Sequence, residues 1–359
     1  MKTPPLPPGS TIGIMGTGQL GRMLAAAAAK LGFKVIIYGP DKTPPAAQLA
    51  NEHICASYEA RDALELFAQK VDVATYEFEN IPVSTVGLLI KYGASVRPGH
   101  EVLEVCQDRL FEKQFLQKLG LMTAPYWDVK SPHDLEIALK DMEGSGILKT
   151  RRMGYDGKGQ VRLGQGDDPQ TAFKACGGVP AILEEFVEFD CEISQIAMRG
   201  QGGEVSFFDP PHNLHKDGIL HQSHVPANIS LEVSEEARHL TASILEEIDY
   251  IGVLTVEFFW SSRKGLMANE IAPRVHNSGH WTVEACVSSQ FEQHIRAIAG
   301  WPLGSSARHS NAVMTNLIGE DVKGWSDLIK NPHIALTLYG KEEARQGRKM
   351  GHTVETSPL

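Results

Sequence analysis

Residues 253–271 read VLTVEFFWSSRKGLMANEI, two mostly apolar runs separated by a polar segment that ends in glycine. Residues 253–260 are rich in β-branched and aromatic side chains and predict a strand. Residues 261–265 predict a turn, and residues 266–271 predict the returning strand of a hairpin. The two strands are mostly apolar, so each charged side chain on them needs a reason to be there.

Each strand carries one glutamate. With the hairpin centred between Arg263 and Lys264, Glu257 and Glu270 are equidistant from the centre and face each other. Facing like charges destabilise a sheet, and burial raises the cost. We therefore expect a Mg²⁺ ion between the two carboxylates, with Asn269 as a further oxygen donor. The alternative is an exposed hairpin with solvated glutamates.

The next residues favour the metal site. Residues 272–280 read APRVHNSGH, which places Arg274, His276 and Asn277 directly behind Glu270. Arginine binds planar oxyanions through paired hydrogen bonds, and histidine transfers protons near neutral pH.

A candidate phosphate loop lies upstream. Lys149 is expected to end a strand, and residues 150–160 read TRRMGYDGKGQ. Three glycines interleaved with bases predict a mobile loop that closes on phosphates through backbone N–H groups and Lys158. Arg151, Arg152 and Lys158 form a local basic excess that the whole chain lacks. No G-x-x-x-x-G-K-[ST] motif occurs, so the chain is not a P-loop enzyme. An exposed loop rich in glycine and arginine is the alternative.

The chain then offers a candidate nucleotide strand. Residues 181–187 read AILEEFV, and Glu192 follows shortly after. Such a strand can present backbone groups to the edge of an adenine and a carboxylate to ribose hydroxyls.

The first hundred residues predict a doubly wound parallel sheet, because strands alternate with helices. Strands are expected at residues 11–15, 34–38, 71–76 and 94–96. Gly16, Gly18 and Gly21 match the G-x-G-x-x-G dinucleotide fingerprint, and Asp41 lies near the position of the ribose-binding acid. A nicotinamide dehydrogenase is therefore one alternative, and close packing of a helix on a strand without any ligand is another.

The rest of the chain mixes helices and strands. Apolar residues between Leu103 and Leu119 predict one helix that Gly120 ends, and Ser131 begins another with proline at its first position. A further helix is expected at residues 234–247, and the last sixty residues predict a small appended subdomain.

Composition limits the classes of function. The 359 residues carry a formal net charge of -10, which argues against a protein that coats nucleic acid. Five scattered cysteines without a C-x-x-C pair favour reduced thiols in a cytoplasm, and we expect neither a signal peptide nor a membrane span.

A zinc protein is a third alternative. His212-x-x-His215 and His221-x-x-His224 have the spacing of ligands. No cysteine or H-E-x-x-H helix accompanies them, and the segment is expected to be a loop.

Several blocks together resemble one family. They are GTGQLGRM at 16–23, TYEFENI at 75–81, QDRL at 107–110, GYDGKGQ at 154–160, HNLHKDGIL at 212–220, NEIAPRVHNSGHWT at 269–282 and GRKMGH at 347–352. In this order they resemble the 5-(carboxyamino)imidazole ribonucleotide synthetases of the ATP-grasp superfamily, over nearly the whole chain. Met153 stands where many relatives have glycine, and we expect it to stiffen the loop slightly.

The resemblance implies an α/β chain with the ATP-grasp fold. A Rossmann-like pre-ATP-grasp domain would cover residues 1–100, an ATP-grasp domain residues 101–300 with a lid at about 125–190, and a small C-terminal subdomain residues 301–359. The implied activity is the carboxylation of 5-aminoimidazole ribonucleotide with ATP, Mg²⁺ and bicarbonate through carboxyphosphate, by a cytoplasmic homodimer. Formate-dependent ribonucleotide transformylase and biotin carboxylase share the ATP half and are the nearest rivals.

The resemblance also implies roles for individual residues. ATP would be bound by Arg109, Lys149, Gly154, Tyr155, Asp156, Gly157, Lys158, Gly159, Gln160, Glu184, Glu185, Phe186, Val187, Glu192, His215, Asn269 and Glu270. Mg²⁺ would be bound by Glu257 and Glu270. Bicarbonate and the aminoimidazole would meet Tyr155, Asp156, Arg274, His276 and Asn277. The ribose phosphate would meet Lys341, Arg348 and the turn that contains Gln19, and either Glu77 or Glu79 would face the exocyclic amine.

Overall fold

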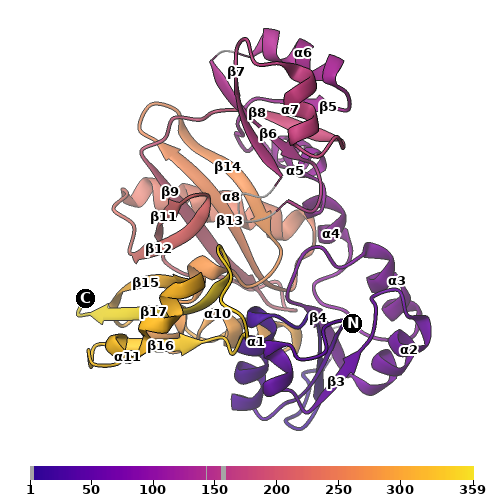
Figure 1. Cartoon of the computed structure of the whole chain (residues 1–359). Helices are drawn as coiled ribbons and strands as arrows, with labels where there is room; N and C mark the ends of the chain where they lie inside the picture. The colour runs from indigo at the N-terminus through magenta and orange to yellow at the C-terminus, as the bar shows by residue number, and fades with distance from the viewer. Residues whose placement is uncertain (1–3, 143, 155–158) are drawn as a thin grey trace.

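The computed structural model describes residues 4–142, 144–154 and 159–359, which form three β-sheets with helices packed on them (Figure 1). The first is a four-stranded parallel sheet in the order β3-β2-β1-β4. It comprises β1 (Thr11–Met15), β2 (Lys34–Gly39), β3 (Glu52–Cys55) and β4 (Val73–Tyr76), with α1 (Gln19–Lys30), η1 (Pro45–Gln48), α2 (Arg61–Lys70) and α3 (Val83–Lys91) between the strands.

This sheet confirms the predicted parallel arrangement, with two differences. Residues 94–96 do not form a strand, because Val96 makes only an isolated bridge to Ala74. Strand β3 was not predicted; its burial is only partial and its sequence, EHIC, has no apolar run.

The predicted helix at residues 103–119 is two helices, α4 (Glu101–Cys106) and α5 (Arg109–Lys118). The break occurs at Asp108, whose carboxylate accepts a hydrogen bond from Leu110 N at 3.1 Å and so caps the second helix. An apolar pattern continues across such a break, which is why periodicity alone did not reveal it.

A small antiparallel sheet, in the order β5-β8-β6-β7, lies at the top of Figure 1, away from the first sheet. Its elements are β5 (Tyr126–Val129), α6 (Pro132–Asp141), β6 (Ser145–Thr150), β7 (Gln160–Gly164), α7 (Pro169–Ala175) and β8 (Ala181–Glu185). Ser131 caps α6 by accepting from Asp134 N at 3.2 Å, as the sequence predicted. Leu135, Leu148 and Leu183 belong to a core that this sheet shares with its own two helices.

The third sheet has nine strands. They are β9 (Cys191–Arg199), β10 (Val205–Phe207), β11 (His212–Lys216), β12 (Ile219–Val225), β13 (Gly252–Ser261), β14 (Gly265–Ala272), β15 (Asn311–Ile318), β16 (Ile334–Leu338) and β17 (Lys349–Ser357). The helical elements around it are α8 (Leu231–Glu247), η2 (Asn277–Gly279), α9 (Thr282–Ala285), α10 (Gln290–Ile298), η3 (Gly319–Gly324) and α11 (Trp325–Leu328). Strand β15 pairs with β12, so the C-terminal strands extend the same sheet.

Helix α10 connects the first and third sheets. His294 on this helix lies within 2.8 Å of Thr75 Oγ1 in β4 and accepts a hydrogen bond from Val253 N in β13. Lys30 of α1 pairs with Glu292 of α10 at 2.7 Å. In the part of the chain that the structure describes, no helix is long and apolar enough to cross a membrane.

Gly13 in β1 gives a test of how tightly the first sheet packs. A Cβ at this position would lie 2.5 Å from Phe67 Cζ and 2.8 Å from Val71 Cγ1. We expect Gly13→Ala to lower the free energy of unfolding by about 1–3 kcal/mol through overpacking, as measured by urea denaturation. Gly87→Ala in α3 is the control, because its methyl group would meet nothing within 4 Å. Equal effects of the two changes would contradict the packing argument.

Candidate active site

The hairpin of β13 and β14 places Glu257 directly opposite Glu270, as the sequence predicted. The predicted turn centre was wrong, however. Ser261 pairs with Gly265 and Phe258 with Ala268, so the turn is centred on Arg263 and an unbroken ladder would pair Glu257 with Asn269. A bulge at Asn269 shifts the register by one residue and restores the pairing of the two glutamates.

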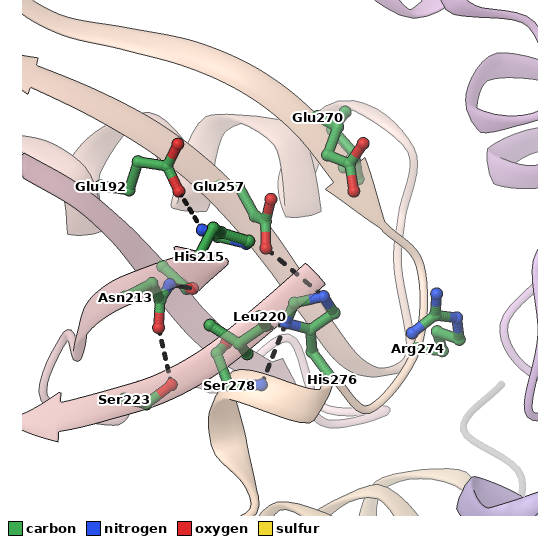
Figure 2. Close-up of polar contacts among 12 residues, drawn as sticks. Glu192, Asn213, His215, Leu220, Ser223, Glu257, Glu270, Arg274, His276 and Ser278 are labelled. Atoms are coloured by element: carbon green, nitrogen blue, oxygen red, sulfur yellow. Dashed lines mark hydrogen bonds and ion pairs between the residues drawn. The ribbon is translucent and has the colours of Figure 1, made fainter. Parts of the chain in front are cut away.

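The environment of Glu257 disfavours its negative charge. Burial, followed by the charge of Glu270, raises the pKa of Glu257 to about 8. His276 Nε2 lies 3.5 Å from Glu257 Oε1, and Figure 2 shows both side chains in the same region as His215. A divalent cation between the two carboxylates would reverse this preference, and the paired oxygens suit Mg²⁺.

Helix α5 lines the same site with three charged side chains. Arg109 lies 3.4 Å from Glu270, Glu112 accepts from Ile271 N at 2.6 Å, and Lys113 donates to Asn269 O at 2.8 Å. Burial, followed by the charge of Glu270, raises the pKa of Glu112 to about 8. Glu112 and Lys113 were not predicted from the sequence. Their spacing of three and four residues from Arg109 puts all three on one face of the helix, a signal that could have identified them.

Lys149, at the end region of β6, meets a carboxylate of the neighbouring strand. Its Nζ donates to Glu184 Oε2 at 3.0 Å, and Lys113 Nζ lies 3.5 Å from the same oxygen. Burial alone would raise the pKa of Glu184, but the charges of Lys113 and Lys149 outweigh it and lower that pKa to about 2. Glu184 is therefore ionised, and its Oε1 is buried without a partner among the described residues.

The segment after β8 leads from the small sheet to the large one. Glu185 N donates to Pro125 O and Phe186 N to Ser145 O, while Arg162 stacks on the Phe186 ring. Val187 packs with Met267 of β14. The predicted nucleotide strand therefore ends where the small four-stranded antiparallel sheet meets the nine-stranded sheet.

The two arginines of the predicted phosphate loop are already paired. Arg151 donates to both oxygens of Asp108, at 2.9 and 2.8 Å, and to Asp128 at 3.2 Å. Arg152 donates to Asp108 at 3.1 Å. Both arginines of this local basic excess are therefore engaged by carboxylates, and a role of theirs toward phosphates stays a prediction.

Of the remaining residues of the predicted phosphate loop, the structure describes some and not others. Gly154 O accepts from Arg109, and Gly159 and Gln160 lead into β7. The predictions for Tyr155, Asp156, Gly157 and Lys158 lie outside the described residues. Met153 has φ 62°, a left-handed conformation that favours glycine.

The segment that follows β14 brings together its predicted residues. Arg274 Nε donates to Glu79 in a short bond, and this pair raises the pKa of Arg274 although burial opposes it. His276 Nδ1 lies 2.8 Å from Ser278 Oγ, and burial, followed by the charge of Arg274, keeps the pKa of His276 well below its ordinary value. His276 is therefore neutral.

Within the described part of the chain, the side-chain amide of Asn277 lacks the hydrogen bonds that buried amides normally make. Its side chain is buried, yet neither Nδ2 nor Oδ1 has a hydrogen-bond partner among the described residues. An amide that is removed from water without partners costs free energy unless a ligand supplies them.

Glu192 and His215 form a pair on the neighbouring strands β9 and β11. A short bond joins His215 Nδ1 to Glu192, and it raises the pKa of His215 although burial opposes it (Figure 2). A small pocket beside this pair is also lined by Glu257 and Asn269. The predicted nucleotide-binding residues Glu192 and Asn269 thus share a pocket with the predicted metal ligand Glu257.

The histidines considered for zinc do not gather. Their segment is the hairpin of β11 and β12 and not a loop, which corrects the expectation. His212 faces His224, with ring centroids 6.5 Å apart, whereas His215 binds Glu192. Within residues 4–142, 144–154 and 159–359, no three His, Cys, Asp or Glu side chains form a group that could hold a metal ion; the proposed magnesium site has only two carboxylates.

The glycine-rich turn is already occupied by a side chain of the protein. Gly18 N and Gly21 N both donate to the carboxylate of Glu77, the second at 2.7 Å. The same N–H groups would have to bind a dinucleotide phosphate or the substrate's ribose phosphate, so both expectations need Glu77 to move. Asp41 accepts from Thr17 at 3.0 Å.

Gln19 and the C-terminal loop complete the predicted substrate residues. Gln19 begins α1 next to this turn, and Lys341 lowers the pKa of Glu77 through its charge, although burial raises that pKa overall. Lys341 also donates to Lys349 O at 2.6 Å, and Arg348 donates to Glu343 O at 3.0 Å. Lys341 therefore lies on the Glu77 side of the site.

Comparisons with known proteins agree with this geometry. The family model of the ribonucleotide synthetase preATP-grasp domain matches residues 10–107, that of the ATP-grasp domain residues 114–291, and that of the phosphoribosylaminoimidazole carboxylase C-terminal domain residues 312–357.

Complete relatives match as well. The N5-carboxyaminoimidazole ribonucleotide synthase of Brucella melitensis is 53% identical over 355 residues, which cover 98% of each chain. A solved N5-carboxyaminoimidazole ribonucleotide synthetase with ADP has a TM-score of 0.95 at 41% identity, covering 99% of this chain and 94% of that chain. The Aspergillus clavatus synthase, solved with ADP and 5-aminoimidazole ribonucleotide, has a TM-score of 0.91 at 28% identity, covering 98% and 94%. This chain therefore belongs to the N5-carboxyaminoimidazole ribonucleotide synthase family of ATP-grasp ligases.

Proposed function

We propose that this protein uses ATP and bicarbonate to carboxylate the exocyclic amine of 5-aminoimidazole ribonucleotide, in the biosynthesis of purine nucleotides. The observation that carries the proposal is the facing pair Glu257 and Glu270 beside Arg274, His276 and Asn277. This arrangement combines a cation site with groups that bind an oxyanion and move a proton. The fungal relative solved with ADP and 5-aminoimidazole ribonucleotide supports the choice of substrates.

ATP would lie between the small sheet and the hairpin. Its adenine would meet the segment from Glu184 to Val187, where the two sheets join, and its ribose would meet Glu192 and His215. Lys149 and Arg109 would bind its phosphates together with residues 154–160.

Glu257 and Glu270 would hold Mg²⁺, and Asn269, which lines the same small pocket as Glu257, would add an oxygen ligand. Bound there, the ion would offset negative charge on the phosphates of ATP and on the transferred phosphoryl group. The raised pKa of Glu257 supports this assignment, because a bound cation would favour the ionised form of the pair.

The reaction would proceed in two transfers. An oxygen of bicarbonate attacks the γ-phosphorus, the bond to the bridging oxygen breaks, and ADP leaves carboxyphosphate behind. The amine nitrogen then bonds to the carboxyl carbon, phosphate departs with the electrons of the broken C–O bond, and the amine loses a proton. Arg274 would bind the carboxyphosphate oxygens, and neutral His276 or Asp156 would take the proton.

The nucleotide substrate would lie between the first sheet and the C-terminal loop. Lys341, Arg348 and Gln19 would bind its ribose phosphate, with Glu77 or Glu79 facing the amine. Glu79 is engaged with Arg274 and Glu77 with the glycine-rich turn, so each would exchange a partner when substrate binds. We further propose that the protein acts in the cytoplasm, which the five free cysteines support, and that it is a homodimer, as the family resemblance implies.

The assay of the whole reaction tests the proposal. We expect phosphate release from MgATP to be strongly stimulated by 5-aminoimidazole ribonucleotide and bicarbonate together, with formation of a labile carboxylated product. Bicarbonate-depleted buffer is the control. If the protein instead turned over formate or biotin and did not respond to the ribonucleotide, the proposed substrate would be wrong. The proposed ATP site would be unaffected by that result.

Arg274→Ala tests the oxyanion clamp. We expect kcat for carboxylation to fall at least about 100-fold, because a buried donor to the reacting oxyanion is lost, while ADP affinity measured by calorimetry stays unchanged. Arg308→Ala is the matched control, since Arg308 is similarly buried and pairs with Asp209. Unchanged turnover in Arg274→Ala would remove this residue from the mechanism.

The pKa of Glu257 gives a pH prediction. Because this pKa is about 8 in the folded chain and 4.5 ordinarily, the folded state binds the extra proton between these values, and stability without Mg²⁺ falls as pH rises through that window. Binding of MgADP at pH 7 should release a proton, measured by calorimetry in buffers of different ionisation enthalpy.

Glu257→Gln should reduce this proton release. Without Mg²⁺, the stability of this variant should also fall less steeply as pH rises. Some pH dependence should remain, because the pKa of Glu112 is also about 8. Glu247→Gln, on the exposed end of α8, is the control. Proton release as large in Glu257→Gln as in the unchanged protein would exclude Glu257 as its source.

A further inference from the structure

Gln290, the first residue of α10, is fully buried and uses its entire amide group. Its Oε1 accepts from His276 N at 2.9 Å, and its Nε2 donates to His276 O at 2.6 Å. The second hydrogen of Nε2 points toward His280 Nδ1 at 3.2 Å. One side chain therefore binds both backbone groups of the residue that faces Glu257.

These two bonds restrain the peptide groups on both sides of His276. The N–H belongs to the peptide that follows Val275, and the C=O belongs to the peptide that leads into Asn277. Asn277 is the residue whose buried amide has no partner for either polar atom among the described residues. A hydrogencarbonate ion has acceptor oxygens and one O–H donor, so it can satisfy both atoms of that amide.

The turn is packed so that Gln290 has little freedom. Gln290 N donates to Thr282 Oγ1 at 3.0 Å, and Thr282 Oγ1 donates to Gly279 O at 2.6 Å. A Cβ on Gly279 would lie 2.6 Å from Gln290 Oε1 and 2.7 Å from Ile196 Cδ1. Glycine at this position lets the turn approach the amide.

We propose that Gln290 is a positioning residue, which holds His276 and Asn277 so that the carboxyl donor is aligned for transfer. This inference rests on the proposed function and adds a residue that does not itself touch a substrate. A shift of about 1 Å in a reacting group can cost about 100-fold in rate. Loss of Gln290 should therefore lower kcat and let carboxyphosphate hydrolyse before transfer.

The same helix supplies a matched control. Gln293 is equally buried, and its amide donates to Gly304 O at 2.8 Å and accepts from Gly304 N at 2.9 Å. Gly304 lies in a loop that contributes no residue to the site described above. Gln290→Met and Gln293→Met thus remove the same kind of backbone bond pair from the same helix.

The test measures kcat, the KM for ATP, and the ratio of phosphate released to carboxylated product for both variants and the unchanged protein. We expect Gln290→Met to lower kcat about 10- to 100-fold, to raise the ratio above one, and to leave the KM for ATP within about twofold. Gln293→Met should keep the kcat of the unchanged protein and release one phosphate for each carboxylated product. This should hold even if its thermal midpoint falls as far as that of Gln290→Met.

Gly279→Ala is the second variant, because its methyl group displaces the Gln290 amide without removing it. It should also raise the ratio of phosphate released to carboxylated product. If Gln290→Met does not fold, this variant alone tests whether Gln290 positions His276 and Asn277. Equal kcat losses in the two methionine variants, or a ratio of one in Gly279→Ala, would overturn the inference. Failure of the proposed function is distinct: the unchanged protein would then not require 5-aminoimidazole ribonucleotide.

Discussion

The opposition of Glu257 and Glu270 on neighbouring strands is the constraint around which the site is arranged. Two carboxylates that face each other in a partly buried sheet repel, and water cannot screen them fully. The chain offsets part of this repulsion with Arg109 beside Glu270, and burial leaves Glu257 inclined to keep a proton. In the proposed function, a divalent cation that arrives with the nucleotide phosphates would offset the repulsion that remains.

The other cations of the site are paired inside the protein. Arg274 binds Glu79, and Lys149 and Lys113 share Glu184. Each cation therefore has a fixed position before any ligand binds, which lowers the ordering cost of binding. In the proposed function, an incoming phosphate or carboxylate would join or replace an internal carboxylate rather than meet a solvated lysine. This also explains how a chain of net charge -10 can bind anionic substrates.

The sequence predicted the parallel first sheet, the hairpin and the facing glutamates, because alternation and turn composition are local signals. It did not predict the bulge at Asn269: an assumed turn centre, wrong by half a residue, gave the right pair. Glu112 and Lys113 escaped notice because their roles depend on which face of α5 meets β14. The pairing of Glu77 with Gly18 and Gly21 joins residues almost sixty positions apart, and no local pattern encodes it.

Helix α10 links the first and third sheets next to the candidate site. His294 binds Val253 in the strand that carries Glu257, and its other nitrogen meets Thr75, two residues before Glu77. Burial lowers the pKa of His294 to about 4, so the ring is neutral; with Nδ1 accepting from Val253, Nε2 carries the proton and donates to Thr75. One turn earlier, Gln290 fixes the backbone of His276. Strand β13 with Glu257, strand β4 ahead of Glu77 and the turn at His276 are thus all hydrogen-bonded to α10. Relative motion among them requires breaking these buried hydrogen bonds.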